Sequence, residues 1–213
     1  MKINEIFRSI SGESINAGYL AIFIRTFSCN LRCSYCDSMY SVEGQDYMEM
    51  SVEEIVQFIS QWSTKRVVFT GGEPLLQKDA DELIGELSNR GYTVEVETNG
   101  AVPLDKFPAS DDSIIYTMDW KCPSSGMNSK MISRNLELLD EHDVIKFVVG
   151  SEEDLDEVAK IIPQTRAIPF ISPVFGKIDP KDIIQYMKDH NMDTARFQLQ
   201  IHKFVYDPNA KGV

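Results

Sequence analysis

The sequence has few of the features that mark membrane and secreted proteins. Its longest uninterrupted apolar run is Tyr19–Ile24, far short of the ~20 residues that a membrane-spanning helix needs. Glu5 and Arg8 interrupt the start of the chain, so we expect no secretory signal and a location in the cytoplasm. No stretch rich in proline, glycine or serine divides the 213 residues. We therefore expect a single catalytic or binding domain over residues 1–213, with no membrane partner.

Positive charge is also scarce. The chain has 21 Lys and Arg residues against 33 Asp and Glu residues, which gives a net charge of −12. A field of that sign repels phosphate backbones. We therefore expect no nucleic-acid partner.

Cysteine is rare, but three of the 4 cysteines lie close together. Cys29, Cys33 and Cys36 share one short stretch, and Cys122 stands apart. In a reducing compartment such clustering favours metal ligation or redox chemistry over structural disulfides.

Apolar segments of strand length alternate with amphipathic segments of helix length from about residue 19 to residue 202. This alternation is typical of β/α units with a parallel sheet. Seven strands are too few for a closed eight-stranded barrel. We expect an α/β fold with a partial (open) β/α barrel of about six to seven mostly parallel strands, and a doubly wound sheet is the alternative. The predicted strands are Tyr19–Phe27, Arg66–Thr70, Tyr92–Thr98, Ile114–Met118, Val144–Val149, Ala167–Ile171 and Arg196–Ile201.

Helix start signals lie between these strands. Ser51-x-x-Glu54 and Ser151-x-x-Asp154 predict capped helices, and Asp179 before Pro180 predicts a third. Two further helices are expected over Leu75–Asn89 and Asn128–Leu139. The segments Asn4–Gly18, Ser38–Met50, Cys122–Lys130 and Asp207–Val213 show no regular pattern and are expected to be loops.

Polar motifs follow the carboxyl ends of several predicted strands, where parallel α/β folds bind ligands. They are the cysteine stretch, Gly71–Pro74, Glu97–Gly100, Asp119–Lys121 and Ser172–Pro173. We expect the functional site at that edge of the sheet.

The spacing Cys29-x3-Cys33-x2-Cys36 indicates a metal site more strongly than any other motif. Three thiolates cannot complete a tetrahedral zinc site, but they can hold three irons of a [4Fe–4S] cluster. The alternatives are a zinc site completed by Cys122 or a histidine, and a thioredoxin-like pair at Cys33 and Cys36 that leaves Cys29 unexplained.

This cysteine loop, with Tyr35 before its last cysteine and Gly71-Gly72-Glu73-Pro74 after the next strand, resembles the radical S-adenosylmethionine (SAM) enzymes. The resemblance implies a cluster whose fourth iron is chelated by SAM. It also implies that one-electron reduction releases a 5′-deoxyadenosyl radical, which abstracts hydrogen from the substrate.

Further motifs narrow the resemblance to the 7-carboxy-7-deazaguanine synthase family, lyases that make a precursor of queuosine and other 7-deazapurines. They are Phe7–Ser14, Phe23–Thr26, Cys36–Ser38, Glu97–Gly100, Lys121–Gly126 and Gln200–Lys203. The chain departs from the family pattern at Ser11 and Ser14, where we would expect Gln and Gly. The resemblance implies conversion of 6-carboxy-5,6,7,8-tetrahydropterin to 7-carboxy-7-deazaguanine with loss of ammonia, assisted by Mg2+.

The resemblance also implies site residues, in addition to the three cysteines. The expected SAM contacts are Tyr35, Asp37, Gly71, Gly72, Glu73, Gly100, Asp119, Trp120 and Lys121. The simpler reading of Gly71 and Gly72 is an ordinary strand-to-helix turn, and that of Lys121 is a surface lysine. Cys122 is expected to be packed rather than to ligate iron.

Arg25 interrupts the most apolar predicted strand, so its guanidinium needs a partner such as a carboxylate. The resemblance makes that partner the 6-carboxylate of the pterin and assigns Arg25 to catalysis. The alternative is a structural pair with Glu13 or another acid. The other expected substrate contacts are Ile10, Ser11, Gly12, Glu13, Thr98 and the C-terminal Val213. Ser38 is expected to bind Mg2+, and capping of the cysteine loop is its alternative role.

The expected partners are a small-molecule pterin substrate, an electron donor such as flavodoxin or ferredoxin, and a second copy of the chain in a homodimer. One competing function is a radical SAM activase that places a glycyl radical on a partner protein. Another is a non-catalytic iron–sulfur or zinc-binding module, which would leave Gly71–Pro74 unexplained.

Overall fold

The computed structural model describes residues 1–207 and 210–212, so the predicted contact at Val213 lies outside the described residues. Nine strands in the described part of the chain form one sheet in the order β3-β1-β2-β4-β5-β6-β7-β8-β9. The strands are β1 (Lys2–Ile10), β2 (Leu20–Thr26), β3 (Met48–Glu49), β4 (Arg66–Gly71), β5 (Thr93–Thr98), β6 (Ile114–Asp119), β7 (Val144–Val149), β8 (Ile168–Pro173) and β9 (Arg196–Phe197). The helices are α1 (Val52–Ile59), α2 (Ala80–Asn89), α3 (Asn135–Leu138), α4 (Glu152–Ile161), α5 (Pro180–Asp189) and α6 (His202–Val205).

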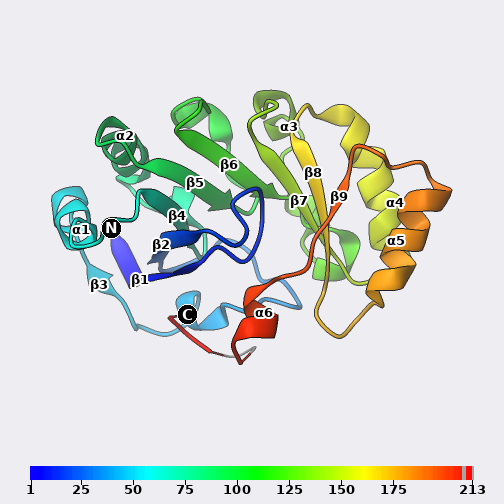
Figure 1. Ribbon diagram of the computed structural model, residues 1–213, viewed down its shortest axis with the longest axis horizontal. Helices are drawn as coiled ribbons and strands as arrows, with labels where there is room; N and C mark the ends of the chain where they lie inside the picture. The colour runs from blue at the N-terminus through cyan, green and yellow to red at the C-terminus, as the bar shows by residue number, and fades with distance from the viewer. Residues whose placement is uncertain (208–209, 213) are drawn as a thin grey trace.

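The seven predicted strands are all present, and each pairs in parallel with its neighbour from β2 through β9. The sheet curves into an arc with helices α1 to α5 on its outer side and α6 on its inner side (Figure 1). Because the arc does not close, the expected open β/α barrel is confirmed. Strand β9 is shorter than the predicted Arg196–Ile201.

Two strands were not predicted. β1 pairs antiparallel with both β2 and β3, so it extends the arc beyond the parallel strands. Its pairing register with β2 shifts between Ile3 and Glu5. This irregularity breaks the alternation of apolar and polar residues by which a strand is recognised in a sequence.

The capping signals predicted α1, α4 and α5 correctly, and each begins one residue after its predicted cap. Leu75–Asn89 is not one helix, because Pro74–Leu76 forms a 3-10 turn and α2 begins only at Ala80. Asn128–Leu139 contains a 3-10 turn and the single-turn α3 rather than a full helix. No helix in the described residues is long and apolar enough to span a bilayer.

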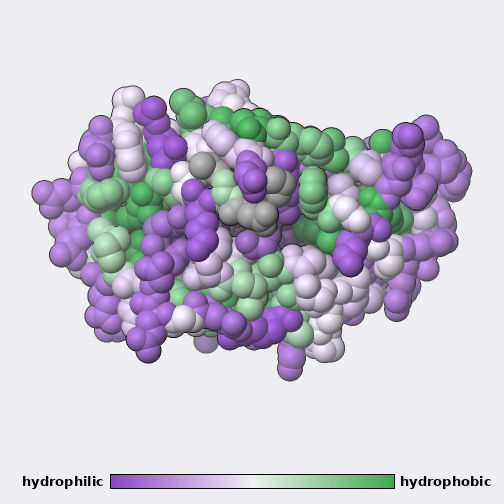
Figure 2. Space-filling model, turned by 90° about the horizontal axis from the view of Figure 1, so that it is seen from below, coloured by the Kyte–Doolittle hydropathy of each residue, from purple (hydrophilic) through white to green (hydrophobic). Residues whose placement is uncertain are grey.

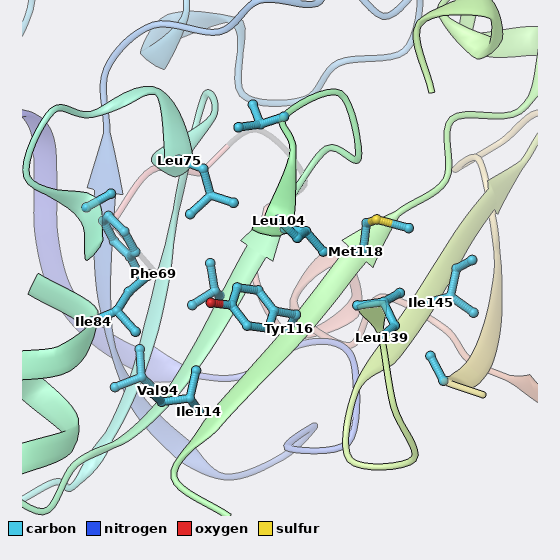
Figure 3. Close-up of a cluster of buried hydrophobic side chains, with 14 of the residues drawn as sticks. Phe69, Leu75, Ile84, Val94, Leu104, Ile114, Tyr116, Met118, Leu139 and Ile145 are labelled. Carbon is cyan, nitrogen blue, oxygen red and sulfur yellow. The ribbon is translucent and has the colours of Figure 1, made fainter. Parts of the chain in front are cut away.

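The two faces of the sheet carry different side chains. The outer side chains of β4 to β7, such as Phe69, Val94, Tyr116, Met118 and Ile145, pack with residues of the helices in one hydrophobic cluster (Figure 3). On the inner face, five adjacent parallel strands each place at least one polar residue against a cavity. These residues are Arg25, Thr70, Glu97, Asp119 and Lys146. Burial of apolar side chains on the outer face stabilises the fold. The polar side chains of the inner face are available to bind ligands in the cavity.

The segment that follows β9 closes the inner side of the arc against the loop after β1. The Ile201 amide donates to the Gly12 carbonyl oxygen at 3.0 Å. A Cβ atom on Gly12 would collide with the imidazole of His202, so a larger residue here would force that side chain to move. Residues far apart in the sequence therefore share one wall of the cavity.

Candidate active site

A cavity of about 630 Å³ lies at the carboxyl ends of the parallel strands. Figure 2 shows the inner side of the arc, with a hollow near its middle that hydrophilic side chains border. Most of the predicted site residues line this cavity, namely Ile10, Gly12, Glu13, Arg25, Cys29, Cys33, Tyr35, Cys36, Asp37, Ser38, Gly71, Gly72, Thr98, Asp119 and Lys121. The strand-edge location predicted from the sequence is therefore where the structure places them.

The cysteine loop is held by hydrogen bonds to the segment that follows β6. The Ser34 amide donates to the Ser125 carbonyl oxygen at 3.0 Å. The Ser34 hydroxyl donates to the Ser124 carbonyl oxygen at 2.7 Å. These bonds keep all three cysteines, each partly buried, at the cavity.

The surroundings of the cysteines fit a cluster ligand set. Cys29 Sγ accepts hydrogen bonds from the Leu31 amide and from Asn99 Nδ2, both at 3.4 Å. Donors of this kind stabilise sulfur that carries negative charge. Burial raises the pKa of the Cys29 and Cys33 thiols, so metal binding must displace their protons.

Cys122 does not join them. It is fully buried in the hydrophobic cluster, and its Sγ lies 3.7 Å from the Trp120 carbonyl oxygen. In the described part of the chain, no three His, Cys, Asp or Glu side chains converge on a position for a single metal ion. The structure therefore gives no support to a zinc site completed by Cys122.

Gly71 and Gly72 allow the end of β4 to lie against the cysteine loop. A Cβ on Gly72 would lie 2.2 Å from the Ser28 carbonyl oxygen, and one on Gly71 would lie 2.4 Å from the Thr26 backbone. Gly71 has a φ of 143°, in the region that favours glycine. The turn is therefore more than a route into a helix, because any side chain here would displace the cysteine loop.

Glu73 lies beneath the cavity rather than on its wall. Its carboxylate accepts hydrogen bonds from the Asn99 amide at 2.7 Å, the Leu75 amide at 3.0 Å and the Thr98 hydroxyl at 2.8 Å. Burial raises the pKa of Glu73 to about 7, although these three donors oppose the shift. Glu73 ties β4 to β5, and its predicted contact with SAM stays a prediction.

The segment that ends β6 alternates between the two faces. Asp119 and Lys121 line the cavity and form an ion pair of 2.8 Å. Burial would raise the pKa of Asp119, but Lys121 and Lys146 lower it below its ordinary value. The side chain of Lys121 is only 13% exposed and paired with Asp119, so Lys121 is not a simple surface lysine. Trp120 instead lies in the hydrophobic cluster, where its Nε1 donates to Glu157 at 3.2 Å.

Two other predicted residues also lie off the cavity wall. Gly100, with a φ of 73°, packs its backbone against the Asp119 carbonyl oxygen. Ser11 is buried, and its hydroxyl donates to the Glu13 carbonyl oxygen at 3.1 Å. Ser11 thereby holds the backbone of the neighbouring cavity residue Glu13.

Arg25 forms an ion pair with Glu5, with 2.8 Å between its Nε and Glu5 Oε1. The Tyr40 hydroxyl donates to the same Oε1 at 2.9 Å. Glu13, the acid weighed as a structural partner, does not pair with Arg25. It pairs with Lys146, which also lies 3.5 Å from Asp119, and it accepts a hydrogen bond from Gln200.

Asp37 forms an ion pair of 2.9 Å with Lys203, a residue of α6. Burial would raise the pKa of Asp37, but the nearby Lys203 ammonium lowers it to about 2. The Tyr35 hydroxyl donates to the Val148 carbonyl oxygen at 3.1 Å. The Ser38 hydroxyl makes no cap with the 3-10 turn that follows it and donates only to Asp37, at 3.3 Å.

Sequence reasoning did not assign roles to several cavity residues, among them Glu5's partner Tyr40, Lys146 and Glu97. A signal existed for Lys146, because it interrupts the apolar strand Val144–Val149 as Arg25 interrupts β2. No such signal exists for Tyr40, because only the folded loop brings it to Glu5.

Comparisons with known proteins agree with this geometry. The Radical SAM superfamily pattern matches residues 23–116. The fold resembles that of the crystal structure of QueE from Escherichia coli, with a TM-score of 0.78, 22% identity and 94% of each chain covered. It also resembles Streptococcus suis SuiB bound to S-adenosylmethionine, with a TM-score of 0.61, 16% identity, 81% of this chain and 48% of that chain covered.

Proteins with similar sequences indicate the family within this superfamily. A 7-carboxy-7-deazaguanine synthase of Clostridium acetobutylicum is 42% identical over 100% of this chain and 99% of its own length. That of Methanospirillum hungatei JF-1 is 47% identical over 96% of this chain and 85% of its own length. Identity of this level over whole chains, with the three cysteines gathered at one cavity, shows that the chain belongs to the 7-carboxy-7-deazaguanine synthase family of radical SAM enzymes.

Proposed function

We propose that this chain is a radical SAM lyase that converts 6-carboxy-5,6,7,8-tetrahydropterin to 7-carboxy-7-deazaguanine with loss of ammonia. The observation that carries the proposal is that the cysteine loop and Arg25, a carboxylate-binding side chain, open into the same cavity. A non-catalytic iron–sulfur or zinc-binding module would not require a cavity with this polar inner wall.

The cofactors of this family are a [4Fe–4S] cluster, SAM and Mg2+. When bound, they supply a one-electron reduction and a radical that abstracts hydrogen from the substrate. In this chain Cys29, Cys33 and Cys36 hold the cluster. The cavity residues Tyr35, Asp37, Gly71, Gly72, Asp119 and Lys121 border SAM, and Glu73, Gly100 and Trp120 support that wall.

On the substrate side, Arg25 receives the 6-carboxylate, because a guanidinium matches a carboxylate with two parallel hydrogen bonds. Ile10, Gly12, Glu13 and Thr98 border the pterin, and Ser11 holds the backbone of this wall. Val213, which lies outside the described residues, is proposed to contact the substrate. The cavity wall residues exclude water from the reacting atoms, which limits side reactions of a radical.

The Ser38 hydroxyl is the proposed protein ligand of Mg2+, with substrate oxygens and water completing the coordination. Mg2+ retains several waters and needs few protein ligands. Because Ser38 makes no capping hydrogen bond, its hydroxyl can turn to a cation.

Residues 1–213 are proposed to act as one catalytic domain, as a homodimer in the cytoplasm. The electron donor is proposed to be flavodoxin or ferredoxin. The substrate is the free pterin rather than a nucleic acid, in keeping with the net charge of −12.

The test is anaerobic incubation of the reconstituted protein with reductant, SAM, Mg2+ and the carboxypterin. We expect 7-carboxy-7-deazaguanine and ammonia in equal amounts, identified by mass spectrometry. Cleavage of SAM without this product would contradict the proposal. Formation of a glycyl radical on an added partner protein would favour the activase instead.

A further inference from the structure

Within the described part of the chain, Arg25 is hydrogen-bonded at one edge only. Its Nε donates to Glu5 Oε1 at 2.8 Å. Among the described residues, no group accepts a hydrogen bond from its Nη1 or Nη2, although Arg25 lines the cavity. A guanidinium has five N–H donors in a rigid plane, and four of them are on Nη1 and Nη2. The Nη1/Nη2 edge, which can bind a carboxylate with two parallel hydrogen bonds, therefore has no partner among the described residues.

Glu5 is itself held in place. The Tyr40 hydroxyl donates to the same Oε1 at 2.9 Å, so two donors from different segments converge on one oxygen. The side chains of Glu5 and Arg25 are only 21% and 17% exposed. Burial would lower the pKa of Arg25, but Tyr40 and Glu5 raise it above its ordinary value.

Aromatic rings restrict the guanidinium further. Its central carbon lies 5.9 Å from the ring centroids of both Phe7 and Tyr40. Phe7 is fixed in turn by stacking on Phe23, with 4.9 Å between ring centroids. The guanidinium thus has an aromatic ring near it on β1 and another in the loop after the cysteines, and its Nε is held by Glu5.

The tail of the chain packs against the same group. Lys211 Nζ lies 4.3 Å from the ring centroid of Tyr40, and a Cβ on Gly212 would lie 3.7 Å from Glu5 Oε2. Ala210 and Gly212 line the cavity beside Arg25. The described part of the tail therefore contacts both Glu5 and Tyr40.

We propose that Glu5, held by Tyr40, is a positioning residue that presents the Nη1/Nη2 edge of Arg25 to the substrate carboxylate and so makes the site selective for a carboxylated pterin. This inference rests on the proposed function. Glu5 does not touch the substrate; it sets the orientation of the group that does. A free arginine side chain would have to lose rotamer freedom on binding, whereas Arg25 is already ordered by Glu5.

The test compares two ligands on the anaerobically reconstituted protein, with SAM and without reductant, by titration calorimetry. One ligand is the carboxytetrahydropterin, and the other is the tetrahydropterin that lacks the 6-carboxylate. In the unaltered protein we expect tighter binding of the carboxylated ligand. In Glu5→Ala its dissociation constant should rise about 10- to 100-fold, the value of a hydrogen bond to a charged group. Binding of the ligand without the carboxylate should change less than threefold.

Tyr40→Phe keeps Glu5 but removes one of the two donors to Oε1, so it should weaken carboxylate binding about threefold to tenfold. Glu5→Gln keeps an oxygen that can accept from Nε, so it should bind more tightly than Glu5→Ala. The matched controls are Glu49→Ala, an exposed acid on β3, and Tyr47→Phe, whose ring packs at a tilt against that of Phe27. Neither control should change either dissociation constant.

The inference is overturned if Glu5→Ala and Tyr40→Phe weaken both ligands equally, because that result shows general damage to the site. It is also overturned if neither substitution changes carboxylate binding. If Glu5→Ala fails to fold, the comparison of Tyr40→Phe with Tyr47→Phe decides. Failure of the proposed function looks different, because the unaltered protein would then not distinguish the two ligands or form product.

Discussion

Lys146 and Phe147 are neighbours on β7, yet they lie in environments of opposite kind. Phe147 is fully buried among apolar side chains between the sheet and its helices. Lys146 is 7% exposed and faces the cavity, where it pairs with Glu13. The same alternation occurs at Ile24 and Arg25 on β2, so the difference belongs to the whole sheet.

The two faces differ in what stabilises their side chains. On the outer face, burial of apolar area is favourable for any well-packed residue. On the inner face each buried charge must find an opposite charge, because an unpaired one is strongly unfavourable. The outer face therefore tolerates changes of similar shape and volume, whereas the inner face depends on particular pairs.

The largest expected effect concerns the cysteines. Replacing Cys29, Cys33 or Cys36 singly by Ala should remove the intact cluster and all turnover, because a three-ligand site has no spare ligand. Cys122→Ala, on the outer side, should retain iron and turnover. Iron analysis of anaerobically reconstituted protein measures this, and equal iron loss in the Cys122 variant would contradict the assignment of three ligands.

Phe147→Ala should destabilise the fold by about 3–5 kcal/mol, the usual range for removing a buried phenylalanine. Urea unfolding at constant pH and cofactor content measures the change. Under folding conditions the dissociation constant for the carboxypterin should be unaltered, because Phe147 faces away from the cavity. A large change in that constant would show that the two faces are coupled.

Lys146→Met should destabilise by a similar amount, about 3–5 kcal/mol, because the buried Glu13 carboxylate loses its cation. Unlike the loss of stability caused by Phe147→Ala, the loss caused by Lys146→Met should be partly reversed by a second substitution. Glu13→Gln in the Lys146→Met background removes the unpaired charge and should recover stability in a double-mutant cycle. Additive losses would show that Lys146 acts by packing and not through its charge.

Glu97 adds a pH dependence to the inner face. Burial raises the pKa of Glu97 to about 7, although Lys146 opposes the shift. The unfolded chain loses this proton near pH ~4.3, so stability should decrease as pH rises from about 4.3 through 7. Glu97→Gln should remove about 1–2 kcal/mol of that decrease, a value reduced because the side chain is not fully sealed from solvent. Urea unfolding at pH 5 and pH 8 tests this, and an unchanged difference between the two would contradict it.

The smallest expected effect is that of Ser38→Ala. The cluster and SAM binding should be intact, and only the stimulation of turnover by Mg2+ should weaken. A magnesium titration of the reconstituted variant measures this. Ser41→Ala is the control, because its hydroxyl donates to the Ser38 carbonyl oxygen at 2.8 Å and supports the same loop. If both variants lose iron and respond normally to Mg2+, Ser38 is a structural residue.

The parallel strands, the capped helices and the strand-edge site were predictable because each has a local pattern. Ser51 and Glu54 form the predicted capping box, and the cysteine spacing indicated its own loop. The partner of Arg25 was not predictable. Its guanidinium interrupts an apolar strand, so a carboxylate was expected, but the choice of Glu5 over Glu13 depends on the pairing of β1 with β2. β1 was itself missed because its register shift hides its pattern.

The burial of Trp120 in the hydrophobic cluster was not predicted from the sequence. A sequence motif treats consecutive residues as one unit, so it assigned Asp119, Trp120 and Lys121 together to contact with SAM. The alternation of β6 instead turns Trp120 into the hydrophobic cluster between the two cavity residues. A family motif locates a backbone segment, and the strand geometry decides which of its side chains reach the ligand.

The contacts between the loop after β1 and the segment after β9 also set an order of events during synthesis. The Ser14 amide bonds to the Gln198 side chain, a residue 184 positions later, and Glu13 bonds to Gln200. At a translation rate of ~5–20 residues per second, the two sides of this wall leave the ribosome roughly 10 to 40 s apart. The cysteine loop can make its contacts with Ser124 and Ser125 while the nascent chain is still growing, but this wall of the cavity is completed only when the last strand and the residues after it have emerged.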